Sequence, residues 1–226
     1  MSSDLSKVTY PLVKDLIDPT ESEIEQVVTV LIDAFDGDPF TSILLGGHLE
    51  LAHAELLANV RAALIGGQVH VITVGPSAQD IIGVAVWYPP GSSVFASEEE
   101  RSVGWNQFLE AVPLWLKNWW MDYFIPTVSQ LSARALGPQY SLNAWHLHLF
   151  GVMKKHHRKG YGKAVFRFAE ERVSAACKPI MVETTTEVDV EIYTKLGFRT
   201  VGKTGITSPI ANANMWLMVK EPQGSE

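Results

Sequence analysis

Hydrophobic positions near the start of the chain recur with two different periods. Thr9–Ile17 mixes β-branched and apolar residues, which predicts an edge strand. A helix is predicted to begin at Asp18-Pro19-Thr20-Glu21, with Asp18 as the capping residue and acids in the first turn. Its apolar positions follow the 3.6-residue helical period and are Ile24, Val27, Val28, Leu31, Ile32 and Phe35. Asp36-Gly37-Asp38-Pro39 is expected to end this helix.

A second predicted helix is followed by two strand patterns. The helix covers Leu49–Leu64 and stops at Gly66-Gly67. Gln68–Val74 and Ile81–Tyr88 are then separated by a Gly-Pro-Ser turn, which predicts a hairpin.

Residues 92–140 form the least regular part of the pattern. Trp105, Trp115, Trp119 and Trp120 recur at roughly helical intervals, and Pro113 interrupts them. We interpret the segment as a helical insertion, one broken helix or two short ones, that covers the sheet. A tryptophan-lined cover over a substrate is the alternative interpretation.

From Asn143 onward the pattern alternates regularly between strand and helix. The predicted strands are Ala144–Val152, Ile180–Thr184, Phe198–Val201 and Asn214–Val219, and the predicted helices are Lys159–Ala176 and Val188–Leu196. A hairpin followed by such α/β units predicts a mixed sheet with helices on both faces. The length favours a single domain over residues 1–226.

Composition and charge narrow the possible functions. The 226 residues are 46% hydrophobic and 19% charged, as in an ordinary globular protein. The net charge of −7 argues against a nucleic-acid partner and suits a cationic small molecule. Cys177 is the only cysteine, which excludes a disulfide framework and a multi-cysteine zinc site. Met1–Lys14 lacks the apolar run of a signal peptide and no apolar run reaches membrane-spanning length, so we expect a cytoplasmic protein without membrane contact.

The most informative stretch joins the strand ending at Val152 to the next helix. It is a basic turn that contains Gly160 and Gly162 and opens directly onto the helix. Glycines allow close approach of the backbone to a ligand, and the free amides of a helix N-terminus bind anions. Five cations gather here in an otherwise acidic chain: Lys154, Lys155, Arg158, Lys159 and Lys163. The turn is therefore predicted to bind a pyrophosphate.

Two common nucleotide-binding motifs do not fit this turn. A dinucleotide fingerprint requires glycine or alanine three residues after the second glycine, where Val165 stands. A P-loop requires Ser or Thr at Ala164 and a glycine at His157. Both are excluded by spacing.

The turn resembles that of the GCN5-related N-acetyltransferase (GNAT) superfamily, in which a strand ending in valine leads into Gln/Arg-x-x-Gly-x-Gly/Ala. Val152 and Gly160-Tyr161-Gly162 match this spacing, whereas His157 replaces the usual Gln or Arg. A second block, Tyr193-Thr-Lys-Leu-Gly-Phe198, is similar to the family's Tyr-x-x-Leu-Gly-Phe. The resemblance implies an α/β fold with a central, mixed, mostly antiparallel sheet of six to seven strands.

The same resemblance implies acetyl-CoA as cosubstrate. The residues that it places on this ligand are Phe150, Gly151, Val152, His157, Arg158, Lys159, Gly160, Tyr161, Gly162 and Lys163. A backbone amide at a bulge near Gly151–Val152 is expected to polarise the thioester oxygen. His156 and His157 are interpreted as phosphate-side donors rather than metal ligands, because no paired spacing with carboxylates supports a metal. No metal is predicted.

Two narrower resemblances bear on the acceptor. Parts of the chain are similar to the puromycin N-acetyltransferases, with Asp189 in the place of an asparagine; these are Ala34-Phe35, Pro39, Val84-Ala85-Val86-Trp87, Ala144-Trp145, Gly151-Val152, Glu183-Thr184 and Tyr193. His146-Leu147-His148 resembles the pair that carries protons from the amine in arylalkylamine N-acetyltransferases.

The two histidines are the first candidates for proton transfer. Alternation along a strand places His146 and His148 on one face, about 6.5 Å apart along the backbone. A primary amine has a pKa of about 10 and is mostly charged at neutral pH, whereas an imidazole near pKa 6.5 can accept its proton. His146 matches the usual position of the superfamily's base. Two partly exposed structural histidines, or Glu183 as the base, remain alternatives.

Tyr193 is the candidate acid. A departing thiolate needs a proton or a hydrogen bond, and a phenol with a pKa of about 10 can supply it. The alternative is a core tyrosine on a short amphipathic helix beside Ile192 and Leu196. Asp33, Asp36 and Asp38 lie where the superfamily's acceptor site is bordered, so they are either solvated or an anchor for an ammonium group.

These observations predict an acetyl-CoA-dependent N-acetyltransferase. It would move an acetyl group directly to a primary amine of a small molecule through a ternary complex, because Cys177 has no adjacent histidine that would activate it as a nucleophile. The alternative is a non-catalytic acyl-CoA-binding sensor or scaffold with the same fold.

Overall fold

The structure, a computed structural model, describes residues 9–174 and 177–222. Its strands are β1 (Leu12–Asp15), β2 (Gln68–Thr73), β3 (Ile81–Tyr88), β4 (Trp145–Val152), β5 (Ile180–Thr184), β6 (Arg199–Thr207) and β7 (Asn212–Lys220). Its main helices are α1 (Glu21–Phe35), α2 (Pro39–Leu44), α3 (Ala52–Gly66), α5 (Asn106–Ala111), α6 (Leu114–Asn118), α7 (Ile125–Leu136), α9 (Tyr161–Ser174) and α10 (Glu187–Lys195). Shorter helical segments are Leu49–Leu51, Ala78–Asp80, α4 (Glu98–Glu100), Arg101–Trp105, Trp119–Phe124, α8 (Tyr140–Asn143) and Lys154–His156. Two predictions fall partly outside the described residues. These are residues 1–8 of the N-terminal segment, which is predicted not to be a signal peptide, and the predicted helix end at Ala176.

The strands form a seven-stranded sheet in the order β1-β2-β3-β4-β5-β7-β6. Neighbouring strands run antiparallel except β4 and β5, which are parallel. The predicted edge strand is β1 and the predicted hairpin is β2–β3. The expected mixed, mostly antiparallel sheet is therefore confirmed.

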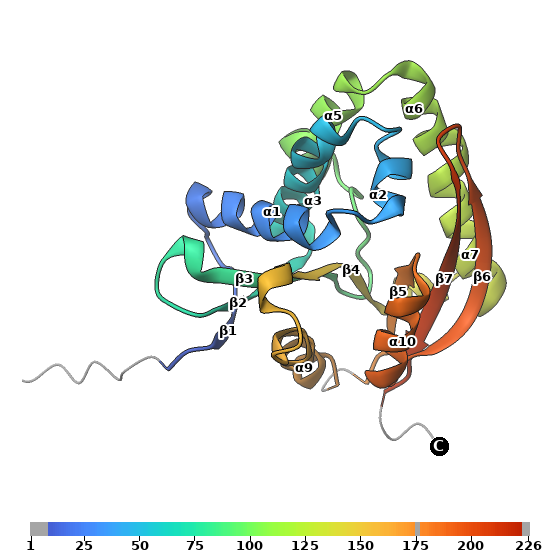
Figure 1. The fold of residues 1–226 in the computed structure, drawn as a ribbon. Coiled ribbons are helices and arrows are strands. Elements are labelled where there is room, and N and C mark those ends of the chain that lie inside the picture. The colour runs from blue at the N-terminus through green and yellow to red at the C-terminus, as the bar shows by residue number, and fades with distance from the viewer. Residues whose placement is uncertain (1–8, 175–176, 223–226) are drawn as a thin grey trace, which may run out of the picture.

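Helices cover both faces of the sheet (Figure 1). The apolar faces of α1 and α3 meet β2 and β3 in one core cluster, which includes Val28, Leu31 and Val84. On the opposite face α9 and α10 enclose a second cluster around Val165, Phe166 and Leu147. These two layers pack β3 and β4 between them, and β4 carries His146, His148, Phe150, Gly151 and Val152 of the predicted site.

Residues 92–140 are helical, as predicted, but divided into more segments than the expected one or two. Trp105, Trp119 and Trp120 are buried and stack edge-to-face or in parallel with Phe108 and Phe124. The same cluster includes apolar residues of β6 and β7. Three of the four tryptophans are thus core residues that join the insertion to the sheet, while Trp115 is 39% exposed.

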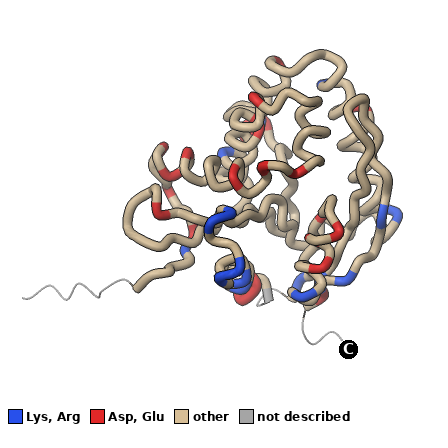
Figure 2. The backbone as a smooth tube through the Cα atoms, viewed as in Figure 1, with Lys and Arg blue, Asp and Glu red and all other residues tan. Residues whose placement is uncertain are grey.

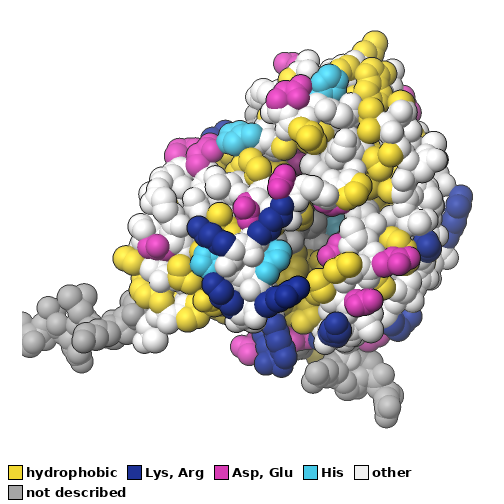
Figure 3. Space-filling model, viewed as in Figure 1, with side chains coloured by type: hydrophobic (Ala, Val, Ile, Leu, Met, Phe, Trp, Pro, Cys, Tyr) yellow, Lys and Arg dark blue, Asp and Glu magenta, His cyan; other side chains and the backbone are white. Residues whose placement is uncertain are grey.

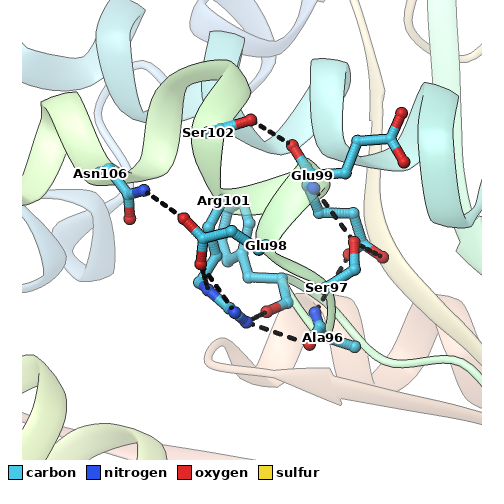
Figure 4. A network of polar contacts seen from close by, with 9 residues as sticks. Ala96, Ser97, Glu98, Glu99, Arg101, Ser102 and Asn106 are labelled. Carbon is cyan, nitrogen blue, oxygen red and sulfur yellow. Dashed lines mark hydrogen bonds and ion pairs between the residues drawn. The ribbon is translucent and has the colours of Figure 1, made fainter.

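The insertion begins at a polar cluster that fixes its first turn (Figure 4). Ser97 Oγ accepts a hydrogen bond from the Glu100 amide at 3.1 Å, as a helix cap does. Arg101 donates to the Phe95 and Ala96 carbonyls at 2.8 and 3.0 Å and to Glu98. The chain leaving β3 is thereby turned into a helix that packs against α3.

Three local predictions are corrected. Thr20, rather than Asp18, caps α1, because Thr20 and Glu23 exchange hydrogen bonds between side chains and backbone. Helix α2 was missed; the Asp38 carboxylate caps it by accepting from the Phe40 amide at 2.9 Å. The strand predicted to end at Val201 extends to Thr207, because it pairs with β7 along its whole length.

Candidate active site

Strands β4 and β5 diverge after a short paired stretch. They pair only through Trp145–Ile180 and His146–Met181. Beyond that point β4 stays paired with β3 as far as Val152, while β5 pairs with β7 as far as Thr184. We call this region the strand divergence; Figure 1 shows β4 and β5 separating there. It leaves one side of β4 without a neighbouring strand in the described structure.

A bulge in β4 lies at His148. Leu147 pairs with Trp87 and Leu149 pairs with Val86, so His148 is one extra residue on this strand. The bulge predicted near Gly151–Val152 is therefore wrong, because the register is regular there. The glycine at position 151 is instead explained by packing, because a Cβ there would lie 2.7 Å from Cβ of Ala34 in α1.

The bulged strand brings two histidines together at the start of the divergence. The rings of His146 and His148 are edge-to-face with centroids 5.5 Å apart, as the strand alternation predicted. His146 Nε2–H donates to Glu183 Oε2 of β5 at 2.6 Å. The side chains of His146 and Glu183 are largely buried, with exposed fractions of 22% and 14% respectively. His146 and Glu183, which the sequence left as alternatives, thus form one pair.

His148 is tied to helix α3. Its Nε2–H donates to Asn59 Oδ1 at 2.7 Å, and Asn59 Nδ2 donates to Glu55 Oε1 at 2.7 Å. We call the series of side chains from Glu183 through His146, His148 and Asn59 to Glu55 the polar chain. Its neighbours are hydrogen-bonded, except that the two histidines meet by a ring contact. Asn59 is 3% exposed. The sequence analysis missed Asn59 and Glu55; the available signal was two polar residues four apart on a mostly apolar helix.

The two imidazoles differ in charge because their surroundings differ. Burial disfavours the imidazolium of His146, but the charge and hydrogen bond of Glu183 outweigh it, so the pKa of His146 is raised. Burial also disfavours the Glu183 carboxylate, yet His146 holds the pKa of Glu183 below its usual value. Burial and the nearby His146 charge lower the pKa of His148 to about 3. Of the two imidazoles, His146 is therefore the one that binds a proton more readily.

Tyr193 lies on α10, where the charges of Asp189 and Glu183 act on its phenol. It is buried and its ring lies edge-to-face against Phe198, with centroids 5.4 Å apart. Burial, with the charges of Asp189 and Glu183, raises the pKa of Tyr193 well above its usual value. The phenol thus keeps its proton throughout the neutral range, as a proton donor must.

The basic turn lies at the far end of β4, where α9 begins. Gly160 has a φ of +81° and nothing lies within 4 Å of a Cβ placed on it, so the backbone is open there. His157 Nε2–H donates to the Val152 carbonyl at 2.7 Å and braces the turn. The turn and the first turns of α9 carry a concentration of Lys and Arg (Figure 2), and their side chains surround histidines on this face (Figure 3).

The five cations of the turn are not equivalent. Lys154 Nζ donates to the Asp36 carboxylate at 2.6 Å, and its amide donates to Asp33 Oδ2 at 2.6 Å. The side chains of Lys155, Arg158 and Lys163 are exposed and make no hydrogen bond or ion pair with other described residues, whereas Lys159 Nζ donates to the Lys155 carbonyl at 3.3 Å. Lys154 therefore joins the turn to the end of α1, and its contribution to an anion site stays a prediction.

The same contacts divide the three aspartates considered as an ammonium anchor. Asp33 and Asp36 are engaged by Lys154. Asp38 is half-buried, and its burial together with the charge of Asp189 raises its pKa. Among these three, Asp38 caps α2 and is the one on which the charge of Asp189 in α10 acts.

Comparison with known proteins identifies this arrangement. A sequence model of the family described as acetyltransferase (GNAT) domain matches residues 132–218, which include β4, the basic turn, α9, β5, α10 and Tyr193. Residues 132–218 are therefore similar to a GNAT acetyltransferase domain. The resemblance found in the sequence is thereby confirmed. No curated protein matches the chain by sequence.

Solved structures share the fold over nearly the whole chain. A Corynebacterium glutamicum protein described as histone acetyltransferase HPA2 and related acetyltransferase is 20% identical, with a TM-score of 0.57 and coverage of 94% of this chain and 96% of that one. Mosquito arylalkylamine N-acetyltransferase like 5b is 15% identical, with a TM-score of 0.56 and coverage of 93% and 99%. Arylalkylamine N-acetyltransferase 2 from Aedes aegypti is 15% identical, with a TM-score of 0.55 and the same coverage. At these identities the likeness establishes the GNAT fold.

The described residues contain neither a metal-binding cluster nor a membrane-spanning helix. Across 9–174 and 177–222, no group of three or more His, Cys, Asp and Glu side chains is placed to hold a metal ion. Within those same ranges, no helix has the length and apolar character that crossing a membrane requires.

Proposed function

We propose that this protein transfers the acetyl group of acetyl-CoA directly to a primary amine of a small molecule. The observation that carries the proposal is the position of the His146–Glu183 pair at the start of the strand divergence, with the basic turn at the other end of β4. One strand thus links a proton-accepting pair to an anion-binding turn. We also propose that residues 1–226 act as a single domain, since one continuous sheet joins strands from both halves of the chain through the β3–β4 pairing.

Acetyl-CoA fits the residues around the turn. The open backbone at Gly160 and the free amides at the start of α9 suit a pyrophosphate, as do the exposed Lys155, Arg158 and Lys163. Phe150, Gly151, Val152, His157, Lys159, Tyr161 and Gly162 complete the proposed binding segment. The bound molecule supplies the thioester, and a backbone amide of the bulged strand is proposed to polarise its oxygen.

His146 acts as the base in the proposed reaction. It takes a proton from the amine, and Glu183 stabilises the resulting imidazolium at 2.6 Å. The amine nitrogen then forms the new C–N bond while the C–S bond breaks. Tyr193 gives its proton to the departing thiolate and regains one from solvent. An ammonium acceptor loses two protons, one to His146 before the attack and one from the nitrogen as the amide forms; Tyr193 delivers one proton to sulfur, and the other passes to solvent.

The acceptor is proposed to be a cationic amine. Asp38, Asp189 and Glu183 are acidic groups whose charges act on one another or on Tyr193. A neutral or anionic acceptor would gain nothing from them, whereas an ammonium group is attracted before it is deprotonated. Two of the similar solved structures are described as arylalkylamine N-acetyltransferases, which act on amines of this kind.

No enzyme-bound acetyl intermediate is proposed. Cys177 precedes β5, at the end of that strand away from Glu183. The amine must therefore attack acetyl-CoA itself, which requires both substrates to be bound together.

Two measurements test the proposal. Calorimetry with CoA should give binding at micromolar to millimolar concentrations, and thioester cleavage should then be found in a screen of small amines. Absence of CoA binding at millimolar concentration would refute the enzyme and the acyl-CoA sensor alike. Binding without thioester cleavage across arylalkylamines, aminonucleosides and polyamines would favour the sensor.

A further inference from the structure

Asn59 holds its amide in one orientation. Its Nδ2 donates both to the Glu55 backbone carbonyl at 3.0 Å and to Glu55 Oε1 at 2.7 Å. A flipped amide would turn Oδ1 toward that carbonyl, which only accepts hydrogen bonds. Oδ1 is therefore directed at His148, where it can only accept.

This orientation determines which nitrogen of His148 carries hydrogen. A neutral imidazole has one N–H and one acceptor nitrogen, and the partner of one ring nitrogen fixes the other. Because Asn59 Oδ1 accepts from Nε2 at 2.7 Å, the hydrogen lies on Nε2. Nδ1 of His148 makes no hydrogen bond within the described residues, and it is not enclosed as both nitrogens of His70 are.

We propose that Asn59, oriented by Glu55, is a positioning residue that locks His148 in its Nε2–H tautomer, so that Nδ1 of His148 is a permanent hydrogen-bond acceptor for the amine substrate. The lock itself concerns the free protein, and only its effect on turnover rests on the proposed acetyl transfer. The division of roles is then clear. His146 with Glu183 takes the proton, while His148 orients the N–H groups of the amine.

The groups around His148 support this division. His146 lies beside it on β4, the ring of Tyr88 on β3 is edge-to-face with it at 5.8 Å, and Asn59 and Glu55 face it from α3. Glu183 acts through His146, and Glu100 faces Tyr88. An amide does not relay protons, so Asn59 also separates the histidines from Glu55, whose pKa burial raises to about 7.

The lock is tested without turnover by nitrogen-15 NMR of histidine-labelled protein between pH 5.5 and 8. His148→Gln assigns the signals. In the unsubstituted protein His148 is expected as the neutral Nε2–H tautomer with no titration over this range. A mixture of tautomers, or a titration of His148 within it, would overturn the inference.

Asn59→Leu removes the acceptor at similar side-chain volume and should give a mixture of tautomers. Glu55→Gln is the matched control, because glutamine keeps an oxygen for Asn59 Nδ2 but does not titrate; the tautomer and the pH profile should be unchanged. Glu55→Ala removes that bond and should loosen the lock partly, which provides a second test if Asn59→Leu does not fold. An unchanged tautomer in Asn59→Leu would overturn the inference.

Turnover gives an independent readout. In Asn59→Leu we expect kcat/KM for the amine to fall roughly 10- to 100-fold, the KM for acetyl-CoA to stay within twofold, and the acid limb of the pH profile to remain at the pKa of His146. A locked tautomer in a protein that acetylates no amine would refute the proposed function alone. Active protein with mixed tautomers would refute the lock alone.

Discussion

The basic turn and the polar chain are built in opposite ways. The turn is contiguous and exposed; it is braced from within by contacts such as His157 to the Val152 carbonyl, five residues apart, and Lys154 ties it to the end of α1. The polar chain is largely buried and joins α3, β4 and β5 through bonds that span 37 and 89 residues. The turn offers mainly backbone amides, whereas the polar chain acts through side chains. We therefore expect substitutions to separate cosubstrate binding from proton transfer.

A second comparison shows that a carboxylate partner alone does not decide the charge of a histidine. His70 Nε2 lies 3.0 Å from Asp15, yet its pKa is lowered to about 4, because burial outweighs Asp15 and Arg172 adds a positive charge nearby. Arg172 also pairs with Asp15 at 3.1 Å. Glu183 has no such competing cation among its described contacts, so it raises the pKa of His146. The partner's other contacts decide the outcome.

The largest effect is expected at the turn. Gly160→Glu should weaken CoA binding by about 100-fold or more, because a carboxylate would meet the phosphate oxygens. Gly160→Ala imposes the same strain at a φ of +81° without the charge, and should cost about tenfold or less. Calorimetry compares the two. Near-normal affinity in Gly160→Glu would show that the phosphates bind elsewhere.

Next in size are substitutions of the proton-accepting pair. His146→Gln should lower kcat/KM by about 10²- to 10⁴-fold and abolish the acid limb, since the base must be deprotonated to act. Glu183→Gln should also lower kcat and move that limb to lower pH, because the charge that raises the pKa of His146 is gone. CoA affinity should be unchanged in both.

Surface substitutions of the same types are the controls for the pair. His48→Gln, at a side chain that is 41% exposed, and Glu187→Gln, at an exposed one, should leave the pH profile as it is. A profile in His146→Gln that coincides with the unsubstituted enzyme would transfer the role of base to water or another group.

A smaller loss is expected from Tyr193→Phe. Removal of the phenol should lower kcat by about 10- to 100-fold with little change in either KM, because the thiolate loses its proton donor. Any decline in rate at high pH should weaken. Tyr140→Phe, which loses a surface hydrogen bond to Glu221, is the control. If kcat fell less than twofold, Tyr193 would be a core residue only.

The smallest effect is expected from Lys154→Met. Its ion pair with Asp36 is exposed, so CoA affinity should change less than twofold and stability by about 1 kcal/mol or less. Lys155→Met should weaken CoA binding more, since its side chain is not engaged by a carboxylate. Titrations at two salt concentrations measure both. Equal losses would mean that the pairing of Lys154 does not matter.

Much of the fold was predictable because its information is local. The 3.6-residue period of α1, the β2–β3 hairpin and the strand–turn–helix around Gly160 each depend on neighbouring residues. The helix α2 and the full length of β6 were not predictable in this way. Their stability comes from a capping carboxylate after a break and from pairing with β7.

The sequence by itself determined the basic turn, the pair of histidines on one strand face and the Tyr-x-x-Leu-Gly-Phe block, because each is a short motif whose geometry follows from adjacent residues. Only the tertiary structure decided that Glu183 joins His146, that Asn59 and Glu55 hold His148, and that Lys154 pairs with Asp36. Those contacts arise where α1, α3, β4 and β5 meet. At that junction burial disfavours the charge of both histidines, but Glu183 raises the pKa of His146 while that of His148 is lowered, although the sequence presents the two as equivalent.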